Sequence, residues 1–77
     1  MHTTVVQDRR FYMECVVVRV MKMRKTSSTV SLVQEVVRLC RPRFTPDPQL
    51  VRTIVDNLIE KQYLQRNDLD DTIAYLA

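Results

Sequence analysis

The sequence of 77 residues contains no glycine, although average usage of about 7% would give roughly five. Phosphate-binding loops of the Walker and dinucleotide types need glycine where the backbone approaches the ligand, and so does the nucleophile elbow of hydrolases. The single histidine, His2, lies at the N-terminus, so the folded part offers none for a catalytic triad or a His-rich metal site. These absences argue against an ordinary enzyme, and no cofactor or metal is expected.

The two cysteines do not suggest a metal or redox site. Cys15 and Cys40 have neither the CxxC spacing of such sites nor the density of a secreted disulfide scaffold. We therefore expect reduced thiols in an intracellular protein. No membrane association is expected, because apolar runs such as Cys15 to Val18 are far below the ~20 residues of a transmembrane helix and the N-terminus lacks the form of a signal peptide.

The length and the charge pattern indicate one small globular domain. Single domains commonly contain about 50 to 200 residues, and a composition of 45% apolar and 27% charged residues is typical of a folded chain. Residues 1–45 carry nine Lys/Arg and three Asp/Glu, whereas residues 46–77 carry three and six. The chain therefore has a basic half and an acidic half.

The first predicted element is a helix over residues 9–25, after a flexible lead-in at residues 1–7. Asp8 can cap this helix, which no glycine or proline interrupts. At about 100° per residue, Lys22 lies near the centre of the polar side, so it is expected to be exposed. The opposite, apolar side gathers Tyr12, Met13, Val16, Val17, Val20 and Met23.

Phe11, Cys15 and Val18 are apolar but fall on the polar side of this helix. Two explanations remain open. A second element of the domain covers them, or they form an exposed apolar strip beside Lys22 that marks a docking surface.

The segment 26–30 is rich in serine and threonine and predicts a turn. A second helix then reaches about residue 40, capped either by Ser28 or by a capping box of Ser31 and Gln34. Its apolar residues recur at helical spacing. They are Leu32, Val33, Val36, Val37 and Cys40.

A basic link at residues 41–46 leads to a third helix at residues 48–61. Asp47 is its predicted N-cap, and Pro48 stands at the first helical position, where no hydrogen bond is lost. This helix has the clearest periodicity in the chain. Its apolar positions are Leu50, Val51, Ile54, Val55, Leu58 and Ile59.

Two short strands, at residues 63–66 and 72–76, surround a turn at residues 67–71 and predict a C-terminal β-hairpin. Three helices followed by a hairpin predict an α+β, mainly α, winged helix: a helix-turn-helix core that the hairpin closes on one side. We assign residues 8–77 to this domain.

Helix-turn-helix folds commonly bind DNA through the second helix of the pair. The exposed side of residues 48–61 carries two positive and two negative charges, and the predicted wing tip contains Asp68, Asp70 and Asp71. Phosphates would be repelled there. A nucleic-acid-binding winged helix is therefore the alternative function rather than the leading one.

Several blocks of the sequence closely resemble the C-terminal winged-helix domain of cullins, the scaffolds of multisubunit RING ubiquitin ligases. Their order and spacing match over about residues 8–77, up to the terminal residues. The blocks are residues 18–25 (VRVMKMRK), 33–36 (VQEV), 43–46 (RFTP), 58–66 (LIEKQYLQR) and 75–77 (YLA).

The resemblance implies that Lys22 is the lysine whose ε-amine receives a ubiquitin-like modifier through an isopeptide bond, in the process called neddylation. This modification activates the ligase in the family. Arg19 and Lys25, one turn to either side, should disfavour the charged form of the amine that must attack. If Lys22 is modified, the domain is a non-catalytic substrate. The alternative interpretation of both Lys22 and Lys25 is that each is an ordinary solvated surface lysine.

The resemblance also implies partners. Arg19, Lys61 and Tyr75 match positions that help form the surface read by the neddylation co-ligase, and we include Lys25 as a candidate partner-binding residue. The other implied partners are the RING-box subunit, the modifier and its conjugating enzyme, the signalosome deneddylase and the cullin exchange factor. The expected location is the cytoplasm and the nucleus.

The chain departs from the usual cullin pattern at a few positions. It has Ser27 and Thr29 where cullins usually show a leucine and then a histidine, Thr45 where a lysine commonly precedes the proline, and Asp47-Pro48 in place of more basic residues. None of these removes a core residue of the third helix, so the fold is expected to survive. A divergent protein-interaction module that has lost modification is the second alternative.

Overall fold

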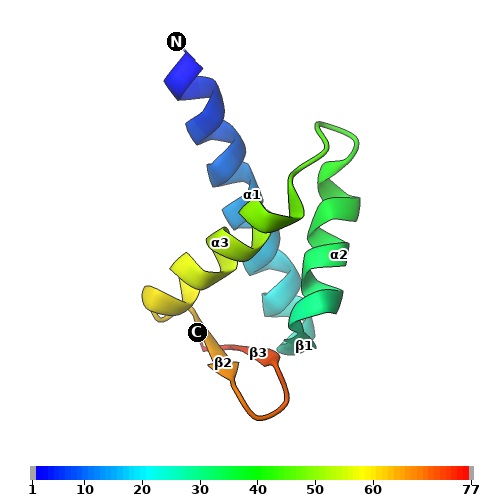
Figure 1. The fold of residues 1–77 in the computed structure, drawn as a ribbon, viewed down its shortest axis with the longest axis vertical. Coiled ribbons are helices and arrows are strands. Elements are labelled where there is room, and N and C mark those ends of the chain that lie inside the picture. Colours follow the sequence, from blue (N-terminus) through cyan, green and yellow to red (C-terminus); the bar gives the residue numbers. More distant parts are fainter. Residues whose placement is uncertain (1, 77) are drawn as a thin grey trace.

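A computed structural model describes residues 2–76, with side chains described from residue 9 onward. Three helices form the bulk of the molecule, and a small sheet lies at the end away from the N-terminus (Figure 1). This is the mainly α winged-helix arrangement that the sequence predicts. The elements are α1 (His2–Arg24), β1 (Thr26–Ser28), α2 (Thr29–Cys40), α3 (Pro48–Glu60), β2 (Leu64–Asn67) and β3 (Thr72–Tyr75).

One hydrophobic core joins the three helices to the hairpin strands. Burying each large apolar side chain contributes about 1.5–3 kcal/mol to stability. In this small domain most of the buried side chains are the apolar residues that recur at helical spacing along the three helices. The buried residues are Met13, Val16, Val17, Val20, Met21, Leu32, Val33, Val36, Cys40, Val51, Ile54, Val55, Leu58, Leu64 and Ile73.

The first helix differs from the prediction at both ends. It begins at His2, so residues 2–7, which the sequence assigns to a separate lead-in, belong to α1. Near its C-terminal end Met21 is fully buried, whereas Met23, predicted on the buried side, is 80% exposed. Met21 continues the i, i+4 row of Met13 and Val17, while Met23 stands at the edge of the apolar face, where no neighbouring element covers it.

Segment 26–28 is the main correction to the predicted fold. The expected turn is an edge strand, because β1 pairs antiparallel with β3 and places Ser27 opposite Ile73 in a sheet of order β1-β3-β2. Tyr75 N donates to Lys25 O at 2.8 Å and extends this pairing. The serines and threonines indicate a turn locally, but the hairpin supplies hydrogen-bond partners that lie far away in the sequence. Ser28 then caps α2, as the first alternative predicts, and its hydroxyl accepts from Ser31 N.

The third helix and the hairpin confirm the prediction within a residue or two at each boundary. Asp47 caps α3 by accepting from Gln49 N at 3.0 Å, with Pro48 in the first turn. The wing turn is held by side chains: Asn67 Oδ1 accepts from Leu69 N at 3.0 Å, and Asp70 Oδ1 accepts from Thr72 Oγ1 at 2.7 Å.

The absence of glycine has a visible structural consequence at the end of α3. Gln62 adopts a left-handed conformation with φ 70°, which costs a non-glycine residue roughly 1–2 kcal/mol. Gln62 N donates to Ile59 O and Tyr63 N donates to Leu58 O, both at 3.0 Å. These two bonds form a Schellman motif, a helix end at which glycine is usual.

Within residues 2–76, no helix is long and apolar enough to cross a membrane. Cys15 and Cys40 are free thiols, the first exposed and the second buried. Burial raises the pKa of the Cys40 thiol, which keeps it protonated and unreactive. The described part of the chain contains no group of three potential metal ligands.

Candidate functional site

Lys22 lies on the exposed side of α1, as its position on the helix predicts. The side chain forms no ion pair with any residue from 9 to 76. The last turn of α1 carries Lys22 and Arg24 and no acidic residue follows before α2, so the surface around this amine is basic. An exposed, unpaired amine is accessible to a macromolecular partner.

A groove of about 660 Å³ runs beside this face of α1. Three of the candidate partner-binding residues line it together: Arg19 from α1, Lys61 from the C-cap of α3, and Tyr75 from β3. They are distant in sequence, and only the packing of α1, α3 and the sheet brings them to one place. Lys25, the fourth candidate, reaches the same surface, because its Nζ lies 5.5 Å from the centroid of the Tyr75 ring.

The apolar strip considered on α1 is exposed at two of its three residues and partly covered at the third. Phe11 is 67% exposed, Cys15 is exposed and Val18 is half-buried. Cys15 and Val18 line the groove, whereas Phe11 lies one turn nearer the N-terminus and does not. The explanation that a second element covers all three is therefore wrong, and the groove combines an apolar wall with a basic rim.

Two further residues of the groove, Tyr63 and Glu14, are not predicted from the sequence. Tyr63, which is 50% exposed, lines the groove directly after the end of α3. Glu14 also lines it and places Oε1 3.8 Å from Lys61 Nζ. Both were visible in the sequence, Tyr63 within the block 58–66, but helical periodicity says nothing about which surfaces of separate elements meet.

The surface used by DNA-reading winged helices is not basic in this protein. Arg66 on β2 donates to Asp56 Oδ1 on α3 at 2.8 Å, which neutralises the positive charge between helix and wing. The wing carries exposed Asp68, Asp70 and Asp71. Phosphate binding at this face is disfavoured on both counts.

Comparison with known proteins finds similar sequences over nearly the whole chain. Residues 8–70 match the family model of the cullin protein neddylation domain. The chain is 46% identical over 74 residues to Cullin-2 of Caenorhabditis elegans, an alignment covering 96% of this chain and 9% of that protein. It is 41% identical over 76 residues to Cullin-1 of Schizosaccharomyces pombe, covering 99% and 10%. The chain thus spans about a tenth of the length of the curated relatives it matches.

The fold is likewise similar to a solved structure described as "A Dual E3 Mechanism for Rub1 Ligation to Cdc53: Dcn1(P)-Cdc53(WHB)". The TM-score is 0.91 at 33% sequence identity, and the match covers 99% of this chain and 88% of that chain. The likeness extends over the whole three-helix core and the sheet.

Proposed function

The chain belongs to the cullin family, of which it is a neddylation domain, and on this premise we propose that Lys22 is the acceptor of a ubiquitin-like modifier. The observation that carries the proposal is the placement of Lys22. It is an exposed amine on α1 without an ion-pair partner among residues 9–76, on the same helix as groove residue Arg19.

The reaction needs only a nucleophile from this chain. The neutral ε-amine of Lys22 attacks the carbonyl carbon of a thioester that joins the modifier to a cysteine of its conjugating enzyme. The C–N bond forms, the C–S bond breaks, and the cysteine sulfur leaves as the thiolate. The proton lost by the amine goes to a base on the partner proteins, because no described carboxylate pairs with Lys22. The domain is then a substrate and not an enzyme.

We further propose that the groove binds the neddylation co-ligase. Arg19, Lys61 and Tyr75 form its charged and aromatic rim, and Cys15 and Val18 its apolar wall. Buried apolar contacts give affinity, while the basic rim selects an acidic partner and orients it. The relative described as Dcn1(P)-Cdc53(WHB) pairs a winged-helix domain of this fold with Dcn1, which supports a partner of the same class for this chain.

The wider role is proposed from the relatives, of whose length this chain spans about a tenth. We propose that this domain serves in a scaffold of a RING ubiquitin ligase that works in the cytoplasm and the nucleus. Its proposed partners include the RING-box subunit, the signalosome deneddylase that removes the modifier, and the cullin exchange factor. Family membership supports these assignments.

The site assignment is tested by reconstitution. The full chain is incubated with the charged conjugating enzyme, the RING-box subunit and the co-ligase, and the adduct is mapped by mass spectrometry. We expect one adduct on Lys22, which Lys22→Arg abolishes. The matched control is Lys25→Arg, an exposed lysine three positions away that should leave the adduct in place. An undiminished adduct in Lys22→Arg would refute the site.

A further inference from the structure

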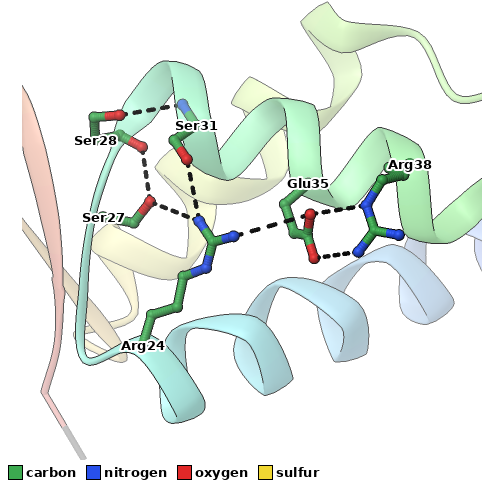
Figure 2. Close-up of polar contacts among 6 residues, drawn as sticks. All are labelled: Arg24, Ser27, Ser28, Ser31, Glu35 and Arg38. Carbon is green, nitrogen blue, oxygen red and sulfur yellow. Dashed lines mark hydrogen bonds and ion pairs between the residues drawn. The ribbon is translucent and has the colours of Figure 1, made fainter.

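A cluster of polar side chains outside the groove joins the end of α1 to the start of α2. It consists of Arg24, Ser27, Ser28, Ser31, Glu35 and Arg38. Figure 2 shows the Arg24 guanidinium among serine hydroxyls: its Nη1 donates to Ser31 Oγ at 3.1 Å and to Ser27 Oγ at 3.4 Å. Ser28 Oγ accepts from Ser31 N at 3.2 Å as the cap of α2. Neutral hydroxyls therefore provide the nearest contacts of this arginine.

The positive charge of Arg24 is only weakly compensated. Its Nη2 lies 3.9 Å from Glu35 Oε1, whereas Glu35 accepts two short bonds from Arg38, at 3.0 and 2.6 Å (Figure 2). The carboxylate thus belongs mainly to Arg38. The first turn of α2 contains no acidic residue of its own, and the carboxylate that reaches it comes from the wing, where Asp71 Oδ1 accepts from Thr29 Oγ1 at 3.1 Å.

We infer that Ser27 is a phosphorylation site, modified by an ATP-dependent protein kinase that recognises basic residues before its acceptor serine. Arg24 stands three positions before Ser27 and Lys25 two positions before it, both exposed. Kinases discriminate substrates by such charge patterns. Ser27 also lies in an extended edge strand that pairs only with β3 among the described strands, which leaves one edge of that backbone open.

Ser27 is a better acceptor than its neighbours. The Ser27 hydroxyl donates to Ser28 O at 3.1 Å but caps no helix, whereas the Ser28 hydroxyl caps α2 and Ser31 lies inside α2, where the backbone is not extended. In the reaction, Ser27 Oγ attacks the γ-phosphorus of ATP: the new O–P bond forms, the bond to the β-phosphate oxygen breaks, ADP leaves, and the hydroxyl proton passes to the kinase aspartate.

The phosphate on Ser27 would lie beside the guanidinium of Arg24, which already contacts the Ser27 hydroxyl. A phosphoserine carries a charge of about −1.5 to −2 and three strong acceptor oxygens. Arg24, now 3.4 Å from the hydroxyl, would exchange a neutral contact for a charge-assisted one, which is roughly twice as strong. The phosphate would then tie the end of α1 to the start of α2 and release Arg24 from Glu35.

The modification also bears on Lys22, a consequence that rests on the proposed function. Lys22, Arg24 and Lys25 make the end of α1 basic, and Lys25 reaches the groove through Tyr75. A dianion at position 27 offsets this positive charge. We therefore expect phosphorylation to slow the modification of Lys22 by partners that recognise a basic surface.

The first test is independent of Lys22. The full chain carrying Lys22→Arg is incubated with labelled ATP and the catalytic subunit of cyclic-AMP-dependent protein kinase, and the phosphopeptide is mapped. We expect phosphate on Ser27, and a loss of at least tenfold in Ser27→Ala. Ser31→Ala, which removes the other hydroxyl bound to Arg24, serves as the control and should be phosphorylated normally. Phosphate on another residue, or none while a control peptide is labelled, would overturn the site.

The second test separates a structural phosphate site from a mere sequence motif. The chain is prepared by synthesis with phosphoserine at position 27, with Arg24 or with Arg24→Gln. We expect the phosphate to raise the melting temperature only when Arg24 is present. Equal shifts in both backgrounds would contradict the contact with Arg24.

The third test concerns regulation. Modification of Lys22 is compared in the phosphorylated and unphosphorylated chain with the charged conjugating enzyme and co-ligase. We expect a severalfold slower reaction of the phosphorylated chain at low salt, and a smaller difference as salt increases. Equal rates would refute the regulatory consequence. If neither form gave an adduct, the result would count against the proposed function of Lys22. The mapping of the phosphate would still stand, because it does not depend on modification of Lys22.

Discussion

Lys61 Nζ lies 3.8 Å from Glu14 Oε1, so an ion pair joins the C-cap of α3 to α1 along the groove. Both side chains are partly exposed, and such pairs contribute only about 0–1 kcal/mol to stability. The importance of the pair is positional, since it holds Lys61 beside α1 and cancels part of the positive charge of the rim.

The first prediction concerns the charge of this rim. Glu14→Gln removes the negative partner, so binding of an acidic co-ligase should strengthen by severalfold at low salt, while stability changes by no more than about 0.5 kcal/mol. Lys61→Glu should weaken binding. The measurement is titration calorimetry at two salt concentrations, with Arg52→Glu, an exposed arginine of α3 outside the groove, as the control. Equal effects of both charge reversals would contradict the groove assignment.

The second prediction concerns the left-handed end of α3. Gln62→Gly removes the steric cost at φ 70° but adds flexibility to the unfolded chain, so the net gain should be about 0.5–1 kcal/mol. The free energy of unfolding is measured by urea denaturation. The control is Gln65→Gly, at an exposed position of strand β2, which should lower stability by about 0.5–1 kcal/mol. A loss of stability in Gln62→Gly would refute the claim that the left-handed conformation of Gln62 destabilises the folded protein.

The third prediction tests the rotation of α1 about its axis. Met21 is fully buried and Met23 is 80% exposed. Met21→Ala should therefore lower the free energy of unfolding by about 2–5 kcal/mol, because it leaves a cavity in the core. Met23→Ala should change it by less than about 0.5 kcal/mol. If Met23→Ala proved more destabilising than Met21→Ala in denaturation experiments, the face of α1 that packs against the core would not be the one described.

The fourth prediction follows from Glu35. The hydrogen bond from Arg38, with the charges of Arg38 and Arg24, lowers the pKa of Glu35 below its ordinary value of 4.5. A carboxyl with a lowered pKa in the folded state stabilises the protein above the unfolded pKa, and this contribution is lost as the pH falls through the folded pKa.

The melting temperature of Glu35→Gln should therefore lie below that of the native chain at neutral pH, and the difference should shrink as the pH falls below the ordinary pKa of 4.5 and Glu35 becomes protonated. Glu60→Gln is the control, because Glu60 is exposed and forms no ion pair with residues 9–76. A difference that stayed constant with pH would show that the charge of Glu35 is not the cause.

The parts of the fold that follow from local pattern were predictable. Asp47 and Pro48 mark the start of α3, apolar residues recur along it at helical spacing, and turn-forming residues separate the two hairpin strands. The exposure of Lys22 follows from its angular position opposite the apolar face of α1. The start of α1 was missed because Asp8 can cap a helix, whereas the helix in fact continues through it from His2.

The candidate site was predictable only in pieces. Arg19, Lys61 and Tyr75 were selected by resemblance to cullins, and nothing in their spacing indicates that they share a groove. Tyr63 and Glu14 were missed for the same reason. The polar residues 26–28 show no apolar alternation and so predict a turn, whereas the strand that they form depends on its partner β3, which lies at the other end of the chain.

The sequence by itself therefore determined which faces of α2 and α3 are buried, most of the buried face of α1, where α3 and the hairpin begin, and that Lys22 is exposed, because side-chain periodicity is a local property of the backbone. Only the tertiary structure decided the third strand and the groove of Arg19, Lys61 and Tyr75. These features arise from contacts between segments far apart in the chain, which local pattern does not encode.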